Sequence, residues 1–432
     1  MVFADEVTIL RRGKLAGQGH VKDLSPDAMA RMMIGAEELT VRPPRSGEFG
    51  APRLNIEKLN ALDDGGQPAV RDVSLSIRGG EIVGVAGVSG NGQRQLIEVL
   101  AGQRDAESGR IFLQGEEYHA TRAEMRHNHL SVLPEEPLKN ACVARMSVAD
   151  NLAFREFDRV PFASGGWWLN GAQFHDNALR KIERYKIKTR SDDTPIGELS
   201  GGNVQRTVLA RELAGEVDIL VAANPCFGLD FAAVAQIHAE IVAARNRGAA
   251  VLLVSEDLDE LLELADRLVV MFHGEIVYEL RSWSEADYHA AAAVITTAYR
   301  GHVDAEINDQ YRTLTGSLRF LNNIVRFPGC GTFDPEGSFV AVHKQSKSLV
   351  GLILCSRVRH DVGHITQVCV LPEFRQHGLG EALIDCTTGN LRKRNFSMLS
   401  LTVTEANVRA VELYLRLGFE KKRIFDAFVW EG

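Results

Sequence analysis

The sequence predicts an α/β protein of two or three domains, and three observations support this class. Its 432 residues exceed what one hydrophobic core usually organises. Apolar runs of strand length, at 82–86, 219–223 and 251–254, alternate with helical patterns, as in a sheet covered on both faces. Glycine-rich segments lead into a helix at 87–92 and again at 375–380.

Composition and charge narrow the class of protein further. Hydrophobic residues make up 45% and charged residues 25%, which is ordinary globular usage. The net charge of −8 has the wrong sign for a polyanion partner, so we expect no nucleic acid. The six cysteines show no C-x-x-C pair and no metal-ligand spacing, which fits a reducing compartment. Asp5 and Glu6 put charge where a signal peptide needs an apolar segment. The apolar runs are far shorter than the ~20 residues of a membrane span, so we expect a cytoplasmic protein.

The chain begins with a short piece, 1–41, that is too small to form a core alone. We expect a strand at 7–10 and a helix beginning at Ser25, because serine followed by proline is a good helix start. Proline, glycine and serine then dominate 42–53, which we interpret as a linker.

The first glycine-rich segment follows the strand 82–86 with the G-x-x-x-x-G spacing of a phosphate-binding loop, whose amides hold phosphate oxygens. Two chemical groups of such a loop are missing. Gln93 stands where a lysine should reach the outer phosphates, and Arg94 where a hydroxyl should bind magnesium. A turn without a ligand is the alternative for this segment alone. The candidate nucleotide-binding residues are Gly87, Ser89, Gly90, Asn91, Gly92, Gln93 and Arg94.

A second motif, L-S-G-G-N-V-Q-R at 199–206, precedes a helix further along the chain. With it, region 54–280 resembles an ATP-binding cassette of bacterial ABC importers, specifically the second, degenerate cassette of the simple-sugar and nucleoside group. Segments 219–225, 228–230 and 254–257 match the Walker B strand, the D-loop and the switch in order. The resemblance implies a P-loop NTPase-like fold and an ABC signature made of Leu199, Ser200, Gly201 and Gly202.

The cassette departs from this family at its catalytic positions. Ala223 and Asn224 stand where Walker B carries an aspartate and a glutamate, and Glu256 replaces the switch histidine. No aromatic residue lies shortly before Val70, where the family carries one that stacks on adenine. With the lysine and hydroxyl also missing, magnesium and the attacking water lack ligands, so we expect no hydrolysis in this site.

The resemblance also implies partners for the cassette. In the family two cassettes face head to tail, so Ser200, Gly201 and Gly202 would close over a nucleotide held by a partner's phosphate loop. Residues 5–36 look like the end of a preceding cassette, so a competent site needs a second cassette on another chain. ATP is the candidate ligand, and membrane permease subunits would hold the chain at the inner face of the cell membrane.

The second glycine-rich segment, R-Q-H-G-L-G-E at 375–381, follows a β-rich run at 365–370 and a proline stop at 371–374. Backbone amides at such a helix start form a pyrophosphate site. The region 281–432 resembles the GNAT acetyltransferases, an acyl-CoA N-acyltransferase α/β fold with acetyl-CoA as cofactor. The resemblance implies that acetyl-CoA binds at Val368, Cys369, Val370, Arg375, Gln376, His377, Gly378, Leu379, Gly380, Glu381 and Asn407.

The family's second motif follows: a strand at 399–403 and a helix at 409–417. Tyr414 falls where GNAT enzymes carry the tyrosine that protonates the departing thiolate, and packing in the core is the alternative. Glu405, His364 and Glu306 are candidates for the base that deprotonates the amine acceptor. The remaining elements of the domain are expected at 290–299, 316–326, 338–343 and 349–358.

Two functions of different class follow from these motifs. The first is an acetyl-CoA-dependent N-acetyltransferase joined to a cassette that lacks most hydrolytic residues. The second is a nucleotide-binding subunit of a sugar or nucleoside transporter that completes a partner's ATP site. A truncated or fused reading frame, in which neither activity survives, is a third interpretation, because no linker separates the two regions near 280.

Overall fold

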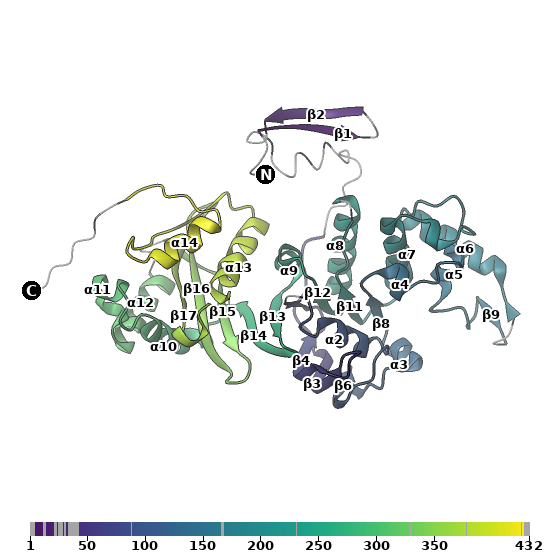
Figure 1. Cartoon of the computed structure of the whole chain (residues 1–432), viewed down its shortest axis with the longest axis horizontal. Helices are drawn as coiled ribbons and strands as arrows, with labels where there is room; N and C mark the ends of the chain where they lie inside the picture. Colours follow the sequence, from purple (N-terminus) through teal and green to yellow (C-terminus); the bar gives the residue numbers. More distant parts are fainter. Residues whose placement is uncertain are drawn as a thin grey trace, which may run out of the picture. The chain divides into compact units, whose positions relative to one another are not determined.

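The computed structural model divides into two compact units, Met1–Val83 with Gly92–Glu256, and Gly84–Asn91 with Asp257–Gly432 (Figure 1). The structure describes residues 5–11, 14–20, 24, 29, 32, 43–87, 89–165, 168–229, 231–327, 331–376, 378–424 and 426.

The first unit begins with an antiparallel hairpin of β1 (Glu6–Arg11) and β2 (Lys14–His20). The predicted strand at 7–10 is confirmed, whereas the helix expected from Ser25 lies outside the described residues. An antiparallel sheet follows in the order β4-β3-β6-β7. Its strands are β3 (Pro52–Leu62), β4 (Pro68–Arg78), β6 (Ser108–Leu113) and β7 (Glu116–Glu117).

Three parallel strands form the buried centre of the first unit. β11 (Ile219–Ala223) pairs with β8 (Leu130–Leu133) on one side and with β12 (Ala250–Val254) on the other. All residues of these strands are buried, which is why their sequences are continuous apolar runs. The helices of this unit are α2 (Gln93–Leu100), α3 (Arg122–His127), α4 (Pro137–Asn140), α5 (Val148–Ala153), α6 (Gly171–Arg184), α7 (Gly201–Leu213) and α8 (Phe231–Asn246). Shorter elements are η2 (Ile196–Glu198) and the two-residue strands β9 (Ala163–Ser164) and β10 (Trp168–Leu169). Strand β5 (Ile82–Ala86) leads into the first glycine-rich loop.

The second unit is built on strands that pair in the order β13-β14-β15-β16-β17-β18. They are β13 (Arg267–Phe272), β14 (Glu275–Ser282), β15 (Thr332–His343), β16 (Ser348–Arg359), β17 (Val362–Val370) and β18 (Met398–Leu401). Neighbouring strands are antiparallel except β17 and β18, which run parallel.

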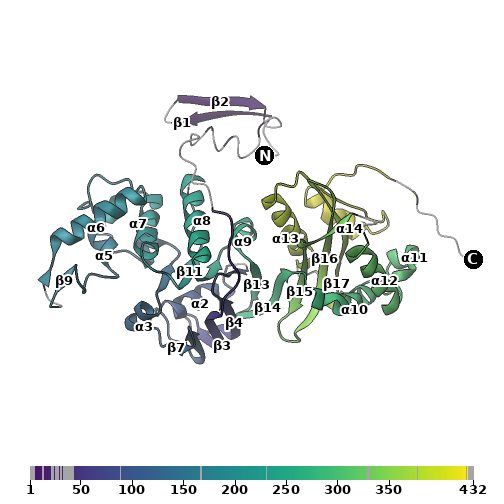
Figure 2. The ribbon, with the colours of Figure 1, turned by 180° about the vertical axis from the view of Figure 1, so that it is seen from behind.

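Helices cover both faces of these strands (Figures 1 and 2). Leu352 and Leu354 of β16 belong to a core formed with α10 and α12, whereas Gly351, which points the opposite way, lies against Leu383 of α13. The helices are α9 (Leu258–Leu264), α10 (Tyr288–Ala298), α11 (Asp304–Ile307), α12 (Leu314–Val325), α13 (Leu379–Lys393) and α14 (Val408–Arg416). Single turns are η3 (Glu285–Asp287), η4 (Asp309–Tyr311) and η5 (Pro372–Phe374).

Strand β14 joins the two regions that the sequence distinguishes. It pairs through Leu268↔Leu280 with β13 and through Leu280↔Ala341 with β15. The boundary expected at 280 therefore falls inside one strand that has a neighbour on each side. The division into 1–41, 42–53, 54–280 and 281–432 stays a prediction.

Candidate functional site

The parallel strands β17 and β18 separate partway along their length. Their ladder covers only Val362↔Met398 to Ile365↔Leu401, whereas β17 continues to Val370. A cavity of about 710 Å³ lies at this split, lined by both strands' ends and by the starts of α13 and α14.

Most residues predicted to bind acetyl-CoA line this cavity. The exception is His377, which lies outside the described residues. Those that line it are Val368, Cys369, Val370, Arg375, Gln376, Gly378, Leu379, Gly380, Glu381 and Asn407.

The start of α13 has the backbone of an anion site. Gly378 is the N-cap with φ 76°, and Gln376 has φ 65°, so the chain turns through left-handed conformations before the helix. A Cβ at Gly378 would meet nothing within 4 Å, so the space above the helix amides is open. Unpaired amides and the helix dipole favour negative charge here, such as a pyrophosphate.

Two of the residues predicted to bind acetyl-CoA also make hydrogen bonds to the backbone around the cavity. Arg375 donates from Nε to the Val370 carbonyl at 3.0 Å and from Nη2 to the Ala298 carbonyl at 2.7 Å, which ties β17 to the end of α10. Asn407 is the N-cap of α14, where its side chain accepts from the Ala410 amide at 3.4 Å. Both residues therefore shape the cavity that they line.

Tyr414 lies on α14, is half-buried and lines the cavity. Burial, assisted by the charge of Asp304, raises the pKa of its phenol to about 12, so the hydroxyl holds its proton at neutral pH. Its ring also contacts that of Phe419, with centroids 5.8 Å apart. Cys369 lines the same cavity, and burial raises the pKa of its side chain to about 12, which leaves a thiol rather than a nucleophilic thiolate.

The three candidate bases do not line this cavity. Glu405 is exposed and pairs with Lys421 at 3.4 Å, and Glu306 is exposed. His364 Nδ1 lies 3.0 Å from Ser400 Oγ, and burial lowers its pKa. The structure brings none of them to the site.

Four residues that motif analysis missed line the cavity instead: Tyr299, His302, Asp304 and Tyr311. They belong to α11, η4 and the segment between α10 and α11. Neither of the two glycine-rich motifs covers this segment, and its concentration of aromatic and acidic residues is the signal in the sequence that could have drawn attention to it.

The first glycine-rich loop is divided between the two units. In the second unit, Asn91 fixes the turn between β13 and β14: its Oδ1 accepts from the His273 amide at 2.8 Å, and its carbonyl from Gly274 at 3.1 Å. In the first unit, Gly92 caps α2 with φ 97° and Gln93 is buried. Arg94 is exposed and pairs with Glu98 at 2.7 Å.

The Walker B position carries an amide that binds backbone. The side-chain oxygen Oδ1 of Asn224 accepts from the backbone N–H of Glu256 at 2.8 Å. The backbone N–H of Asn224 donates to the Val254 carbonyl, also at 2.8 Å. Asn224 thus links the end of β11 to the segment after β12. At the signature, Ser200 is the exposed N-cap of α7, and Gly201 is exposed with nothing within 4 Å of an added Cβ. The D-loop residue Asp230 lies outside the described residues.

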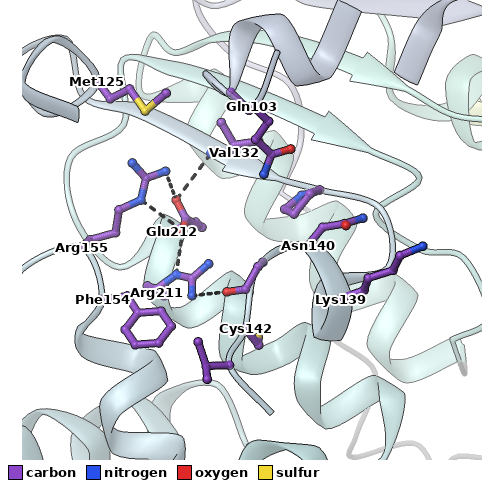
Figure 3. A pocket seen from close by; sticks show the side chains of 14 residues that line it. Gln103, Met125, Val132, Lys139, Asn140, Cys142, Phe154, Arg155, Arg211 and Glu212 are labelled. Atoms are coloured by element: carbon purple, nitrogen blue, oxygen red, sulfur yellow. Dashed lines mark hydrogen bonds and ion pairs between the residues drawn. The ribbon is translucent and has the colours of Figure 1, made fainter. Parts of the chain in front are cut away.

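A second cavity, of about 400 Å³, lies in the first unit and is built around the buried Glu212 (Figure 3). Glu212 accepts from Arg155 Nη2 at 2.5 Å and from Arg211 Nε at 2.7 Å. Burial opposes its ionisation, but the two guanidinium groups outweigh burial and lower the pKa of this carboxyl. Cys142 lines the same cavity, and burial raises the pKa of its thiol to about 11.

These features define two classes of domain: an ATP-binding cassette, and an acyltransferase fold with a split between parallel strands. Residues 70–226 match the ABC transporter family, and residues 299–419 match the acetyltransferase (GNAT) family. The chain therefore contains a cassette of the ABC transporter family and a GNAT acetyltransferase domain. This confirms the fold class and both families, whereas the degeneracy of the cassette stays a prediction.

Curated relatives are import ATP-binding proteins. The chain is 36% identical over 316 residues to a glucose import ATP-binding protein of Haloferax volcanii, with 72% of this chain and 57% of that protein covered. It is 34% identical over 276 residues to a guanosine import ATP-binding protein of Bacillus subtilis, with 64% of this chain and 54% of that protein covered. The chain thus spans about half the length of the curated relatives it matches.

Among solved structures, a nucleotide-free ATP-binding cassette from an ABC transporter aligns with a TM-score of 0.44 at 25% identity. That alignment covers 53% of this chain and 91% of the other. Among the residues that the structure describes, no helix combines the length and apolar character needed to cross a membrane.

Proposed function

We propose that the C-terminal domain transfers the acetyl group of acetyl-CoA to an amine. The cavity at the split between β17 and β18 is the observation that carries this proposal. It joins a site for the acyl chain, along Val368 to Val370, to open amides at Gly378 that suit the pyrophosphate.

The chemistry assigned to this chain is a proton transfer at each end of the reaction. The attacking amine loses protons as its nitrogen bonds to the thioester carbon, and the sulfur gains a proton as the carbon–sulfur bond breaks. Tyr414 is the proposed acid for the second transfer, because its phenol is protonated and lines the cavity.

Heat stability tests this function. Acetyl-CoA at 100-fold over its Kd should stabilise the binding domain by ~2.7 kcal/mol, because a ligand stabilises the state that it binds. Gly378→Glu should remove this response, since a carboxylate would occupy and repel the pyrophosphate position. Gly66→Glu is the matched control: Gly66 has a similar φ of 74° and equally open surroundings, but lies in the first unit. An equal acetyl-CoA response in both variants would contradict the site.

A second function is proposed for the cassette: it completes a nucleotide site held by a partner cassette, in a complex with permease subunits at the inner face of the cell membrane. The exposed, unobstructed signature at Ser200 and Gly201 supports this role. The altered residues Ala223 and Asn224 argue against hydrolysis in its own site. Sugar or nucleoside cargo is proposed from the relatives' import functions.

A further inference from the structure

The acetyl-CoA cavity is also lined by a half-buried carboxylate, that of Asp304. The side chain of Asp304 is 19% exposed and lines the cavity. Its Oδ1 is fully buried with no hydrogen-bond partner among the described residues. Its only ion-pair neighbour in the described part of the chain is His302, at 3.4 Å from Nδ1 to Oδ2.

His302 does not reach the unpartnered oxygen of this carboxylate. Its Nδ1 accepts from the backbone amide of Asp304 at 3.2 Å and lies 3.4 Å from Oδ2, which leaves Oδ1 without a donor among the described residues. A buried acceptor without a donor is costly, and a cationic donor that enters the cavity would remove the cost. The terminal torsion of aspartate is broad, so its carboxylate can turn toward such a donor.

Two aromatic rings stand beside Asp304 as a fixed wall. Tyr299 and Tyr311 stack with centroids 4.4 Å apart at 21°, and Phe320 meets Tyr311 edge-on at 5.0 Å. Gln367 of β17 holds both hydroxyls: its Nε2 donates to Tyr299 at 2.8 Å, and its Oε1 accepts from Tyr311 at 3.3 Å. The wall is thus tied to the strand that lines the acetyl-CoA cavity.

Asp304 also acts on the reacting end of the site. Asp304 lines the same cavity as Tyr414, Tyr299 and Tyr311. Burial raises the pKa of all three phenols, and the charge of Asp304 adds to this effect. An ammonium group bound to Asp304 would therefore lie among aromatic groups, where cations are attracted to ring faces, and on the side of the cavity where Tyr414 stands.

We propose that Asp304 binds the ammonium group of the acceptor and that the Tyr299–Tyr311 wall receives an apolar or aromatic body attached to it. The acceptor class is then a primary amine with one cationic group and no carboxylate beside it, such as an arylalkylamine. A free amino acid would bring its own carboxylate against Asp304 and bind less well. This inference rests on the proposed acetyl transfer.

The test measures acetyl transfer from saturating acetyl-CoA to phenethylamine and to phenylalanine, which differ only by the carboxylate. Phenethylamine should be the better acceptor. Asp304→Asn should raise its KM by about 10- to 100-fold, the range for a lost hydrogen bond to a charged group. Asp304→Glu, which keeps the charge, should restore part of the loss. Acetyl-CoA affinity should stay within about twofold in all variants, because the coenzyme is bound elsewhere in the cavity.

Asp309→Asn is the matched control, since this carboxylate lies in the neighbouring turn η4 but is exposed and outside the cavity. An unchanged KM in Asp304→Asn, or a preference for phenylalanine, would overturn the inference while acetyl transfer itself stands. If no amine is acetylated, calorimetry of phenethylamine with the coenzyme-bound protein decides, and absence of Asp304-dependent binding refutes the proposal. Failure to bind acetyl-CoA at all would instead refute the proposed function.

Discussion

Glu212 shows at the scale of one residue how the first unit tolerates a buried charge. The carboxylate is paired with Arg155 and Arg211, and its backbone carbonyl accepts from Ser131 Oγ at 2.8 Å. The ion pairs compensate for desolvation only while the carboxylate and the guanidinium groups are both present. Removal of one partner leaves the other charges buried and unpaired.

Glu212→Gln should therefore destabilise the first unit by about 3 kcal/mol or more. The midpoint of urea unfolding, followed by circular dichroism, measures this loss. Glu57→Gln is the comparison: it breaks an exposed pair with Arg110, and such pairs contribute less than about 1 kcal/mol. Equal effects of the two changes would show that the buried pairing contributes little.

The same carboxyl makes stability depend on pH in one direction. Its pKa in the folded protein lies below the usual value, so its contribution is present above that usual value of about 4.3. The contribution is lost as pH falls through the folded pKa. The difference in unfolding midpoint between parent and Glu212→Gln should accordingly shrink in acid.

Tyr414→Phe separates an acid from a packing residue. The change keeps the ring and its contact with Phe419, so packing and acetyl-CoA affinity should hardly move. Loss of the phenolic proton should lower kcat by about 100-fold, within the range for general acid catalysis. Steady-state rates with an active acceptor give the answer, and turnover within about twofold of the parent would make Tyr414 structural.

At the scale of elements, the acyl site depends on where two strands stop pairing. β17 runs beyond its ladder with β18, and Arg375 ties its last residue, Val370, to the end of α10. The left-handed turn at Gly378 then starts α13 beside the split. The path of the backbone thus sets the geometry at both ends of the cavity. This explains why a short glycine motif predicts the cavity.

The sequence did not reveal that the single strand β14 belongs to both regions. One strand completes the hairpin with β13 and supplies the first neighbour of β15. α13 and α9 also meet in this unit, where a Cβ on Gly389 would lie 3.3 Å from Leu262. The absence of a linker near 280 therefore agrees with a continuous ladder through the joint.

For the whole molecule, the proposed division of labour predicts no ATP hydrolysis by the purified chain. Ala223 and Asn224 offer no carboxylate, and Asn224 is engaged with the Glu256 amide. Magnesium-dependent phosphate release should stay at background, and Gln93→Lys should not restore it. Turnover by the unmodified protein that Gly92→Glu abolishes would contradict this expectation.

The sequence by itself determined both domain families and the order of their elements. It also predicted the helix that begins after the glycine-rich segment, observed as α13 with Gly378 as its N-cap, and the helix at 409–417, observed as α14. The assignment of acetyl-CoA to these residues stays a prediction. These features are local: a glycine-rich turn and the helix after it bring consecutive amides together whatever the rest of the chain does. Short-range spacing therefore carries the information.

Only the tertiary structure decided which further residues line the cavity. It left Glu405, His364 and Glu306 outside and brought in Asp304 with Tyr299 and Tyr311. It also showed that β14 serves two regions at once. Such neighbours are far apart in the chain, and whether a carboxylate is solvated or buried depends on the packing of α10 to α12 against β17, which no local pattern encodes.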